Sequence, residues 1–335
     1  MDDSVNMSLS KIVKLCSWGS ALVCLSACLE LSEGSRSAPD AAALDAAPLS
    51  DCAHGIASGY NFTAGQSYFG AKQWIEYIPG TLPIIIAAPH GGELTPDEVP
   101  VFNDGLAQDG GSQAYARAVA QALYQLTGRH PHLVINHLAR NRLNLNRAPE
   151  NDNRDNAAAM VAWQEFHHFV EQAKSWVSQA CQKGLYLDFH TNGHDHGYVE
   201  LGYLLTREQL NLSDAQINQL TTSSLTHLAS QDGHSLAALV HGEWSLGQIM
   251  HEQYNILTIP NATDIPFQHR YFSGGYNTRS HGSVAGGVID AIQIESHFNY
   301  VNSGASVRLD YSLRLAHAIH QYMQHWYGFD FDPLH

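Results

Sequence analysis

The chain has 335 residues, enough for one large domain or two modest ones, and its 44% of hydrophobic residues is ordinary for a soluble globular protein. Its 17 Lys and Arg against 32 Asp and Glu give a formal net charge of −15, which argues against nucleic-acid binding because that function needs a clustered basic surface. The 21 histidines are dispersed along the sequence and do not form a tag, which makes metal or proton chemistry plausible; the alternative is that most are surface or hydrogen-bonded structural histidines.

Residues 1–28 are typical of an export signal. Lys11 and Lys14 supply positive charge, and the mostly apolar stretch Ile12–Cys28 is too short for a comfortable membrane span. The end of this stretch, Leu25-Ser26-Ala27-Cys28, resembles a bacterial lipoprotein signal, in which the cysteine becomes the lipidated N-terminus. The alternative is an ordinary secretory signal. In either case we expect an exported protein, periplasmic or held at the outer membrane by a lipid anchor on Cys28.

Two further parts of the chain follow the signal. Residues 29–51 are rich in Ala, Ser, Pro and Asp without periodicity, which predicts a disordered tether. Residues 52–335 show no repeat and no second linker, so we predict a single catalytic domain there. Only Cys52 and Cys181 remain outside the signal, and in an exported protein this pair predicts one disulfide.

Short apolar runs alternate with helical patterns through the predicted domain. The strand candidates, typical of buried strands in an α/β sheet, are Leu82–Ala88, Leu133–Asn136, Leu185–His190, Leu201–Leu205 and Ala291–Glu295. Apolar residues spaced three or four apart predict helices at Ser112–Thr127, Asn156–Gln179 and Ser306–Tyr327. This order predicts a three-layer α/β/α domain with a central mixed, mostly parallel sheet, whose ligands gather at the carboxyl ends of the strands.

Three of the strand candidates end in groups that can do chemistry. They are His90-Gly91-Gly92-Glu93, Asp188-Phe189-His190 and Gln293-Ile294-Glu295. A catalytic zinc ion takes three protein ligands and keeps one open position. His90, Glu93 and His190 supply two imidazoles and a carboxylate, and the two glycines permit the tight turn that would bring His90 and Glu93 together. Asp188 could accept the second ring N–H of a ligand histidine. Because Asp188 and His190 share a face in a straight strand, the alternative is that it holds a neighbouring residue.

The order of these motifs resembles the zinc carboxypeptidase superfamily, and within it the branch of N-formylglutamate amidohydrolase and aspartoacylase. The matching stretches are Pro89–Glu93, Asn144-Leu145-Asn146-Arg147, Asp188–His190 and Gln293–Glu295. The resemblance implies a zinc-carboxypeptidase-like fold that binds one Zn²⁺ ion through His90, Glu93 and His190. It also implies hydrolysis of an amide C–N bond in a small carboxylate-bearing acyl-amino acid or peptide.

The resemblance also implies roles for other residues. Glu295 would be the general base and then the acid that protonates the leaving amine. Arg147, with Asn146, would clamp a substrate carboxylate, a task that suits the guanidinium fork. Either Arg140 or Arg142 would polarise the scissile carbonyl. The alternative for these arginines is a salt-bridged loop.

Two other stretches lie close to the expected site in sequence. Tyr271–Gly282 is rich in glycine and polar groups, and we expect either a loop that closes over the site, with Tyr276 or Arg279 touching substrate, or a hairpin turn. His194 and His196 are expected to line the substrate pocket or to support the metal ligands, with His194 as a substrate-binding residue.

Two alternative functions remain open. The zinc amidase that cleaves the muramoyl–alanine bond of peptidoglycan has motifs like His90-Gly91-Gly92, His190-Thr191-Asn192 and the late Glu295, but its glutamate ligand generally lies further from the first histidine. An exported enzyme would meet envelope peptides, peptidoglycan fragments or scavenged acyl-amino acids, whereas formylglutamate enzymes are typically cytosolic. The second alternative is a non-catalytic lipoprotein that binds a metal or another ligand.

Overall fold

An eight-stranded sheet organises the part of the chain that the computed structural model describes, residues 61–329 without 104, 152–154, 232 and 267–269. All of these residues lie in Ala46–His335, one of the two units into which the chain divides. The expected export signal, the tether and Cys52 lie outside the described residues. Cys181 is disulfide-bonded, but its predicted pairing with Cys52 stays a prediction.

The sheet is mixed and mostly parallel, as predicted. Its strands stand in the order β1 (Tyr68–Phe69), β2 (Ile75–Ile78), β4 (His132–Asn136), β3 (Ile84–Ala88), β5 (Gly184–Asn192), β8 (Ile289–His297), β6 (Val199–Gly202) and β7 (Thr258–Ile259). The four central strands β4, β3, β5 and β8 run parallel, and so do β6 and β7. The pairs β1–β2, β2–β4 and β8–β6 are antiparallel.

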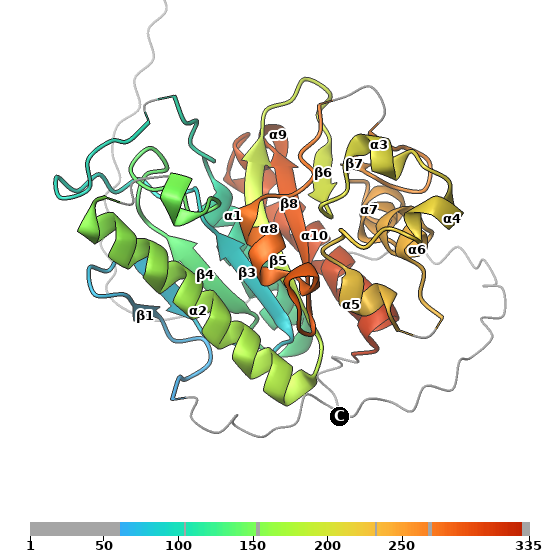
Figure 1. The fold of residues 1–335 in the computed structure, drawn as a ribbon, viewed down its shortest axis with the longest axis horizontal. Coiled ribbons are helices and arrows are strands. Elements are labelled where there is room, and N and C mark those ends of the chain that lie inside the picture. Colours follow the sequence, from blue (N-terminus) through green and yellow to red (C-terminus); the bar gives the residue numbers. More distant parts are fainter. Residues whose placement is uncertain (1–60, 104, 152–154, 232, 267–269, 330–335) are drawn as a thin grey trace, which may run out of the picture. The chain divides into compact units, whose positions relative to one another are not determined.

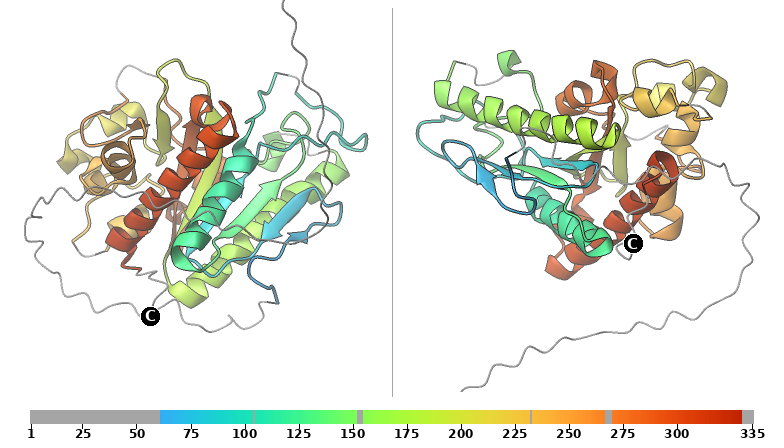
Figure 2. Two further views of the ribbon diagram at one scale, coloured as in Figure 1. Left: turned by 180° about the vertical axis from the view of Figure 1, so that it is seen from behind. Right: turned by 90° about the horizontal axis from the view of Figure 1, so that it is seen from below.

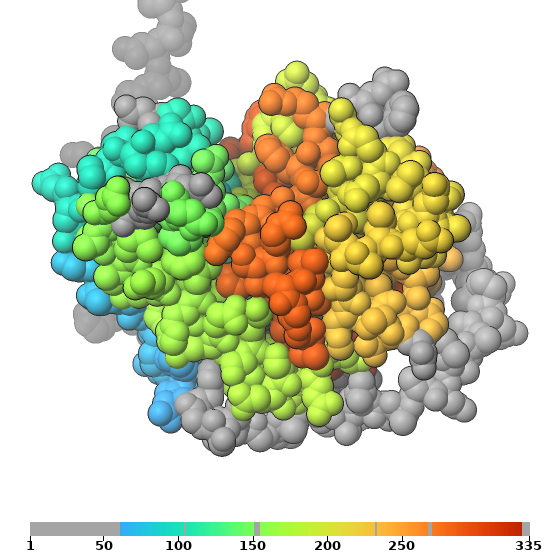
Figure 3. Space-filling model, viewed as in Figure 1, coloured from blue at the N-terminus to red at the C-terminus, as the bar shows by residue number. Residues whose placement is uncertain are grey.

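Helices cover both faces of the sheet, which confirms the three-layer arrangement (Figures 1 and 2). On one face α1 (Ser112–Thr127) packs along α10 (Ala305–Tyr327). On the other face α2 (Ala157–Cys181) crosses the strands, and α8 (Tyr276–His281) lies beside it over β5 and β8. The space-filling view shows α2 and the segment of α8 side by side on the surface (Figure 3).

The long elements follow from the apolar pattern of the sequence. β3 is buried along its whole length, as expected of a strand covered on both faces. In α1 the side chains of Tyr115, Val119 and Ala122 recur at helical spacing and are buried, and the helix ends at Gly128, whose φ of 67° favours glycine. The three predicted helices are confirmed to within two residues at each end. The strand predicted at Leu201–Leu205 instead begins at Val199 and stops at Gly202.

Short helical turns fill the connections, most of them between β6 and β7. They are η1 (Pro149–Asn151), α3 (Arg207–Leu210), α4 (Asp214–Ile217), α5 (Thr226–Ala229), α6 (Leu236–His241), α7 (Leu246–Gln248), the π-helical turn η2 (Ile249–Gln253), η3 (Ser283–Ala285) and α9 (Phe298–Val301). Within the described residues, none of the helices is both long enough and apolar enough to span a lipid bilayer.

Candidate active site and metal centre

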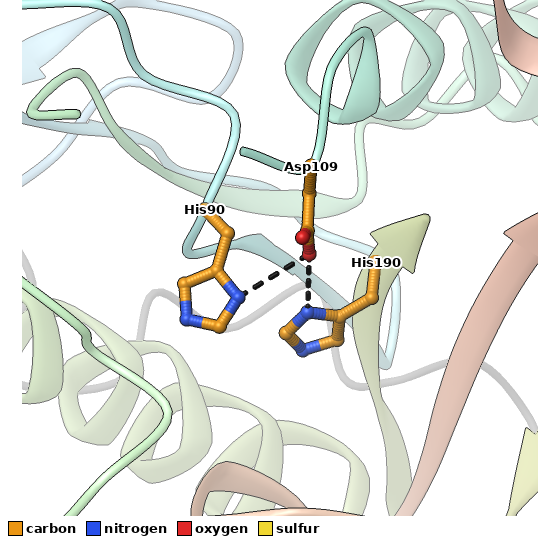
Figure 4. Close-up of side chains that lie close together, drawn as sticks. All are labelled: His90, Asp109 and His190. Carbon is orange, nitrogen blue, oxygen red and sulfur yellow. Dashed lines mark hydrogen bonds and ion pairs between the residues drawn. The ribbon is translucent and has the colours of Figure 1, made fainter. Parts of the chain in front are cut away.

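Two histidines and one aspartate meet at the carboxyl ends of β3 and β5 (Figure 4). His90 follows β3, His190 lies in β5, and Asp109 comes just before α1, where its carbonyl accepts a hydrogen bond from the Ser112 N–H. Nδ1 of His90 lies 3.2 Å from Asp109 Oδ2, and Nδ1 of His190 lies 2.8 Å from the same oxygen. All three side chains are buried, and their spacing could hold a metal ion.

The other ring nitrogen of each histidine has an acceptor. His90 Nε2 lies 2.7 Å from Asn144 Oδ1, and His190 Nε2 lies 3.0 Å from Asp188 Oδ2. Asn144 Oδ1 also accepts the Asn146 N–H at 3.1 Å, which fixes the orientation of that amide. With a cation bound between the two rings, the acceptors at Nε2 would keep the protons there and leave both Nδ1 lone pairs for the ion, as in metal sites whose histidines are oriented by a carboxylate or carbonyl. Without a cation, each Nδ1 has Asp109 as its hydrogen-bond partner. The donor set therefore fits a metal ion.

The charges within the group complement one another. Burial lowers the pKa of His90 to about 4, although the charge of Asp109 opposes this. Burial also lowers the pKa of His190, but the charge of Asp188 and hydrogen bonds to Asp109 and Asp188 outweigh it and hold that pKa well above its usual range. Burial would raise the pKa of Asp109, yet the two histidines hold it well below its usual range. Asp109 is therefore the ionised member around which both imidazoles are arranged.

Glu295 stands next to His190 across the sheet. In β8 it is the register partner of His190 in β5 and of Glu200 in β6. Paired residues point to the same face, so these three form a row on strands about 4.8 Å apart. Burial raises the pKa of Glu295 to about 8; the positive charge of His190 opposes the rise, and the charges of Asp109 and Glu200 add to it. A buried carboxylate of this kind beside a metal centre suits proton transfer.

Glu93, expected as the third ligand, is not brought to the two histidines. Residues 92–94 continue as extended backbone that bridges to Leu138 and Ala139, and the exposed Glu93 side chain lines a separate hollow with Arg117. Gly92 is needed for this close approach, because a Cβ there would lie 2.2 Å from the His137 carbonyl carbon. The carboxylate at the cluster is Asp109, 19 residues after His90. The one sequence signal for it was an aspartate three residues before the start of a predicted helix.

The two candidate arginines differ in position. Arg140 reaches the cluster, where its NH1 donates to Asp109 Oδ1 at 2.6 Å and to the Ala107 carbonyl at 3.0 Å. Arg142 NH1 donates to the Val99 carbonyl at 2.8 Å. Of the two, the structure brings only Arg140 into contact with the His–Asp–His group.

The expected substrate-binding segment lies against the cluster. Asn146 Nδ2 is 3.2 Å from His190 Nε2, although the charged Asp188 oxygen is closer and is the stronger partner of that nitrogen. Arg147 has an exposed side chain, and its carbonyl accepts the Trp163 indole N–H at 3.1 Å. Asn146 and Arg147 are therefore fixed through neighbouring backbone and side chains at the edge of the site.

The glycine-rich stretch Tyr271–Gly282 is helical in its second half. It is therefore neither a loop nor a hairpin throughout, because Tyr276–His281 form α8. Tyr276 begins this helix and the exposed Arg279 lies in its last turn. The contact with the site comes from Asn277, whose N–H donates to Asn146 Oδ1 at 2.7 Å and whose Nδ2 donates to Asp188 Oδ1 at 3.2 Å. The sequence patterns did not single out Asn277.

The fold and this site together define an α/β protein with a buried His–Asp–His group, suited to a metal ion, at the carboxyl edge of its sheet. A search of protein-family models and a search of curated proteins find no match to the chain. Among solved structures, the chain is similar to a gene product of Agrobacterium tumefaciens, at 16% identity and a TM-score of 0.45, over 72% of this chain and 91% of that one. It is also similar to the N-formylglutamate amidohydrolase of Ralstonia eutropha JMP134, at 12% identity and a TM-score of 0.41, over 72% of this chain and 97% of that one. At these levels of likeness, a function has to be argued from the residues of the site.

Proposed function

We propose that the protein is a zinc-dependent hydrolase that cleaves an amide bond in a small carboxylate-bearing acyl-amino acid or peptide. One observation carries the proposal: His90 and His190 both have Nε2 held by an acceptor and turn Nδ1 toward Asp109, with the buried Glu295 beside His190 in the sheet. The motif resemblance to zinc amidohydrolases supports the same reaction through His90, His190, Glu295 and the Asn146-Arg147 pair, but not through Glu93. Because the chain carries an export-like N-terminus, we further propose that the enzyme works in the bacterial envelope, with Cys28 as a lipid anchor.

His90, Asp109 and His190 would hold the zinc ion. Arg140 already bonds Asp109 Oδ1, so it keeps that carboxylate in one orientation with Oδ2 facing both imidazoles. When bound in an open site, zinc lowers the pKa of water to about 7 and polarises a carbonyl.

Proton transfer falls to Glu295 in this proposal. Gln293 Nε2 donates to Glu295 Oε1 at 2.8 Å and holds the carboxylate in place. Glu295 would take a proton from the attacking water and later deliver it to the leaving nitrogen. The exposed guanidinium of Arg147, on the segment that Asn144 and Asn146 fix to the two histidines, would bind the substrate carboxylate.

A second candidate substrate is the muramoyl–alanine bond of peptidoglycan. The specific observation in its favour is the position of Asp109, 19 residues after His90, since the glutamate ligand of that amidase family is also generally further from the first histidine; here the residue is an aspartate. The chemistry is the same in both cases, and only the substrate differs.

Metal content of the full-length chain tests the proposal. Elemental analysis after supply of zinc should give one zinc per wild-type chain, a loss in His90→Ala and Asp109→Asn, and full occupancy in Glu93→Gln, which is the matched acidic control. The zinc-loaded protein is then screened on N-acyl amino acids and on muropeptides. Cleavage of N-acyl amino acids would support an acyl-amino acid as the substrate, and cleavage of muropeptides would support peptidoglycan. Zinc binding without cleavage of either would favour the non-catalytic lipoprotein, and equal zinc in wild type and Asp109→Asn would refute the ligand set.

A further inference from the structure

A second group of two histidines and a carboxylate lies along the same edge of the sheet, with its carboxylate in β6, two strands from β5. Glu200 in β6 is fully buried, and its Oε1 lies 2.6 Å from His194 Nδ1 and 3.2 Å from His196 Nε2. Its Oε2 accepts the Phe272 N–H at 2.6 Å. By spacing alone this group could hold a metal ion, as the first group could.

The positions of the protons separate the two groups. The backbone N–H of Tyr198 donates to His196 Nδ1 at 3.1 Å, so that nitrogen carries the lone pair of the ring. Nε2 of His196 must then carry the proton, and it faces Glu200 and the Arg270 carbonyl, 3.2 Å away. Neither nitrogen of His196 therefore offers a lone pair to a cation held by Glu200. The arrangement is that of a buried carboxylate satisfied by hydrogen-bond donors.

His194 is the member of this group with an unused acceptor. With Glu200 as the partner of Nδ1 at 2.6 Å, the proton of a neutral ring lies on Nδ1 and the lone pair lies on Nε2. Burial and the charge of Arg270 lower the pKa of His194, although the charge of Asp195 opposes this. The lowered pKa favours the neutral ring. Among the described residues, no hydrogen bond to Nε2 of His194 is found, and 12% of its side chain is exposed.

Several contacts connect His194 to the strand that carries Glu295. Glu200 is the register partner of Glu295. Asn192 joins the two segments, because its Nδ2 donates to the Glu295 carbonyl at 2.6 Å and its Oδ1 accepts the His194 N–H at 3.1 Å. The His194 ring stacks on Phe272 with centroids 4.7 Å apart, and 42% of Phe272 remains exposed. An oriented acceptor and an apolar ring face thus lie together near the proposed proton carrier.

We propose that Glu200 orients His194 so that its Nε2 accepts a hydrogen bond from an N–H of the substrate, while the exposed face of Phe272 receives an apolar part of the same substrate. The substrate class is then an amide or amine with an apolar flank, as in a peptide unit. The substrate contact rests on the proposed function, whereas the tautomer of His194 and the absence of zinc at Glu200 do not. Glu200 acts as a positioning residue through His194.

The first measurement is NMR of the full chain labelled with ¹⁵N-histidine, recorded during a zinc titration. We expect His194 as the Nδ1–H tautomer in the wild type, and a shift toward Nε2–H in Glu200→Gln. We also expect zinc binding to saturate at one equivalent in both proteins. His241→Gln is the control. It changes a histidine at the end of α6 that pairs with Asp214 of α4, and it should leave the His194 signals unchanged. An Nε2–H tautomer in the wild type, or a second zinc equivalent that Glu200→Gln abolishes, would overturn the proposal.

The second measurement uses whichever substrate the screen identifies. His194→Phe keeps a ring against Phe272 but removes the acceptor, so KM should rise on the order of 10-fold with kcat changed much less, because one neutral hydrogen bond is lost. This variant leaves Glu200 with one hydrogen-bond donor fewer. The double variant Glu200→Gln/His194→Phe is therefore measured as well, because it also removes the charge of Glu200. It should show the same rise in KM. An unchanged KM in the double variant would refute the substrate contact. Failure to bind zinc or to cleave any substrate would instead count against the proposed function and leave the tautomer result intact.

Discussion

Glu295 and His190 are register partners on the parallel strands β8 and β5, so their side chains leave the sheet on the same face, one strand apart. His190 is bonded to Asp109 within the candidate metal centre, whereas Glu295 is bonded to Gln293 and makes no hydrogen bond to the cluster among the described residues. The sheet itself therefore sets the separation between the group that would carry the proton and the group that would hold the metal.

Replacement of Glu295 by Gln should remove hydrolysis and keep the metal. The amide has the same shape but cannot take up a proton, and the loss of one general base typically lowers the rate by about 10²–10⁴-fold. The rate on the screened substrate and the zinc content are measured on the same preparation. Glu243→Gln, on a surface segment, is the control. Undiminished turnover by the Glu295 variant would remove it from the mechanism.

Replacement of Asn144 by Ala should weaken metal binding without touching a ligand. Asn144 Oδ1 holds the Nε2–H of His90, and partners of this kind typically contribute about 10–100-fold in metal affinity. Competition with a chelator of known zinc affinity measures the change. Asn211→Ala, which alters an exposed asparagine at the end of α3, should leave zinc affinity as in the wild type. Equal affinities in the two variants would contradict the orienting role.

Gly92→Ala should destabilise the fold. The added Cβ would lie within 2.2–2.5 Å of backbone atoms of His137 and Leu138, which cannot rotate away as a side chain can. Overpacking of this kind typically costs about 1–3 kcal/mol, measurable by urea denaturation. Gly105→Ala, whose nearest atom is a side-chain oxygen at 3.4 Å, should change stability by less than about 0.5 kcal/mol. A fully stable Gly92→Ala protein would mean that the 92–94 bridge is not formed as described.

Asp290 should make stability fall as pH rises between about 4 and 7. It lies in β8 away from the site, where burial raises its pKa from 3.8 to about 6, although bonds from Ser283, Leu228 and Tyr327 partly oppose the rise. Because the pKa of Asp290 is higher in the folded state than in the unfolded state, the folded state binds the proton more tightly. The stability that this proton contributes is complete below the unfolded-state pKa of 3.8 and is lost as pH rises above about 6. A rise of about two units corresponds to roughly 3 kcal/mol.

The pH dependence is measured as the free energy of unfolding of wild type and Asp290→Asn across this range. The asparagine cannot titrate, so the variant should lack this fall and the two curves should converge at low pH. Parallel curves would show that Asp290 does not titrate in this window.

The sequence predicted the features that depend on local pattern. Periodic apolar residues indicated the three long helices and the central strands, and the strand ends indicated His90, His190 and Glu295, because parallel strands bring their carboxyl ends to one edge. Asp188 was predicted as an orienting acceptor, and it bonds His190 Nε2.

The features that depend on tertiary packing were not predictable in this way. Asp109 reaches the cluster only because α1 packs behind β3, and Asn277 reaches Asp188 only because α8 packs over β5 and β8. The His-x-x-Glu spacing suggested a turn, but the backbone after His90 pairs with residues 138–139 and carries Glu93 away. The signal, the tether, the lipid anchor and the Cys52 pairing stay predictions.

The register of His190, Glu295 and Glu200 restricts how the sequence of this protein can evolve. Its members belong to three adjacent strands, and a shift of β8 by one residue would turn Glu295 to the opposite face of the sheet. An insertion or deletion of one residue within these strands would therefore separate the three side chains of the site. Asn146, Asn277 and Phe272 come from connecting segments, which can lengthen or change sequence without altering strand register. A descendant of this chain could exchange its substrate by altering these segments while its three in-register side chains stayed where the sheet holds them.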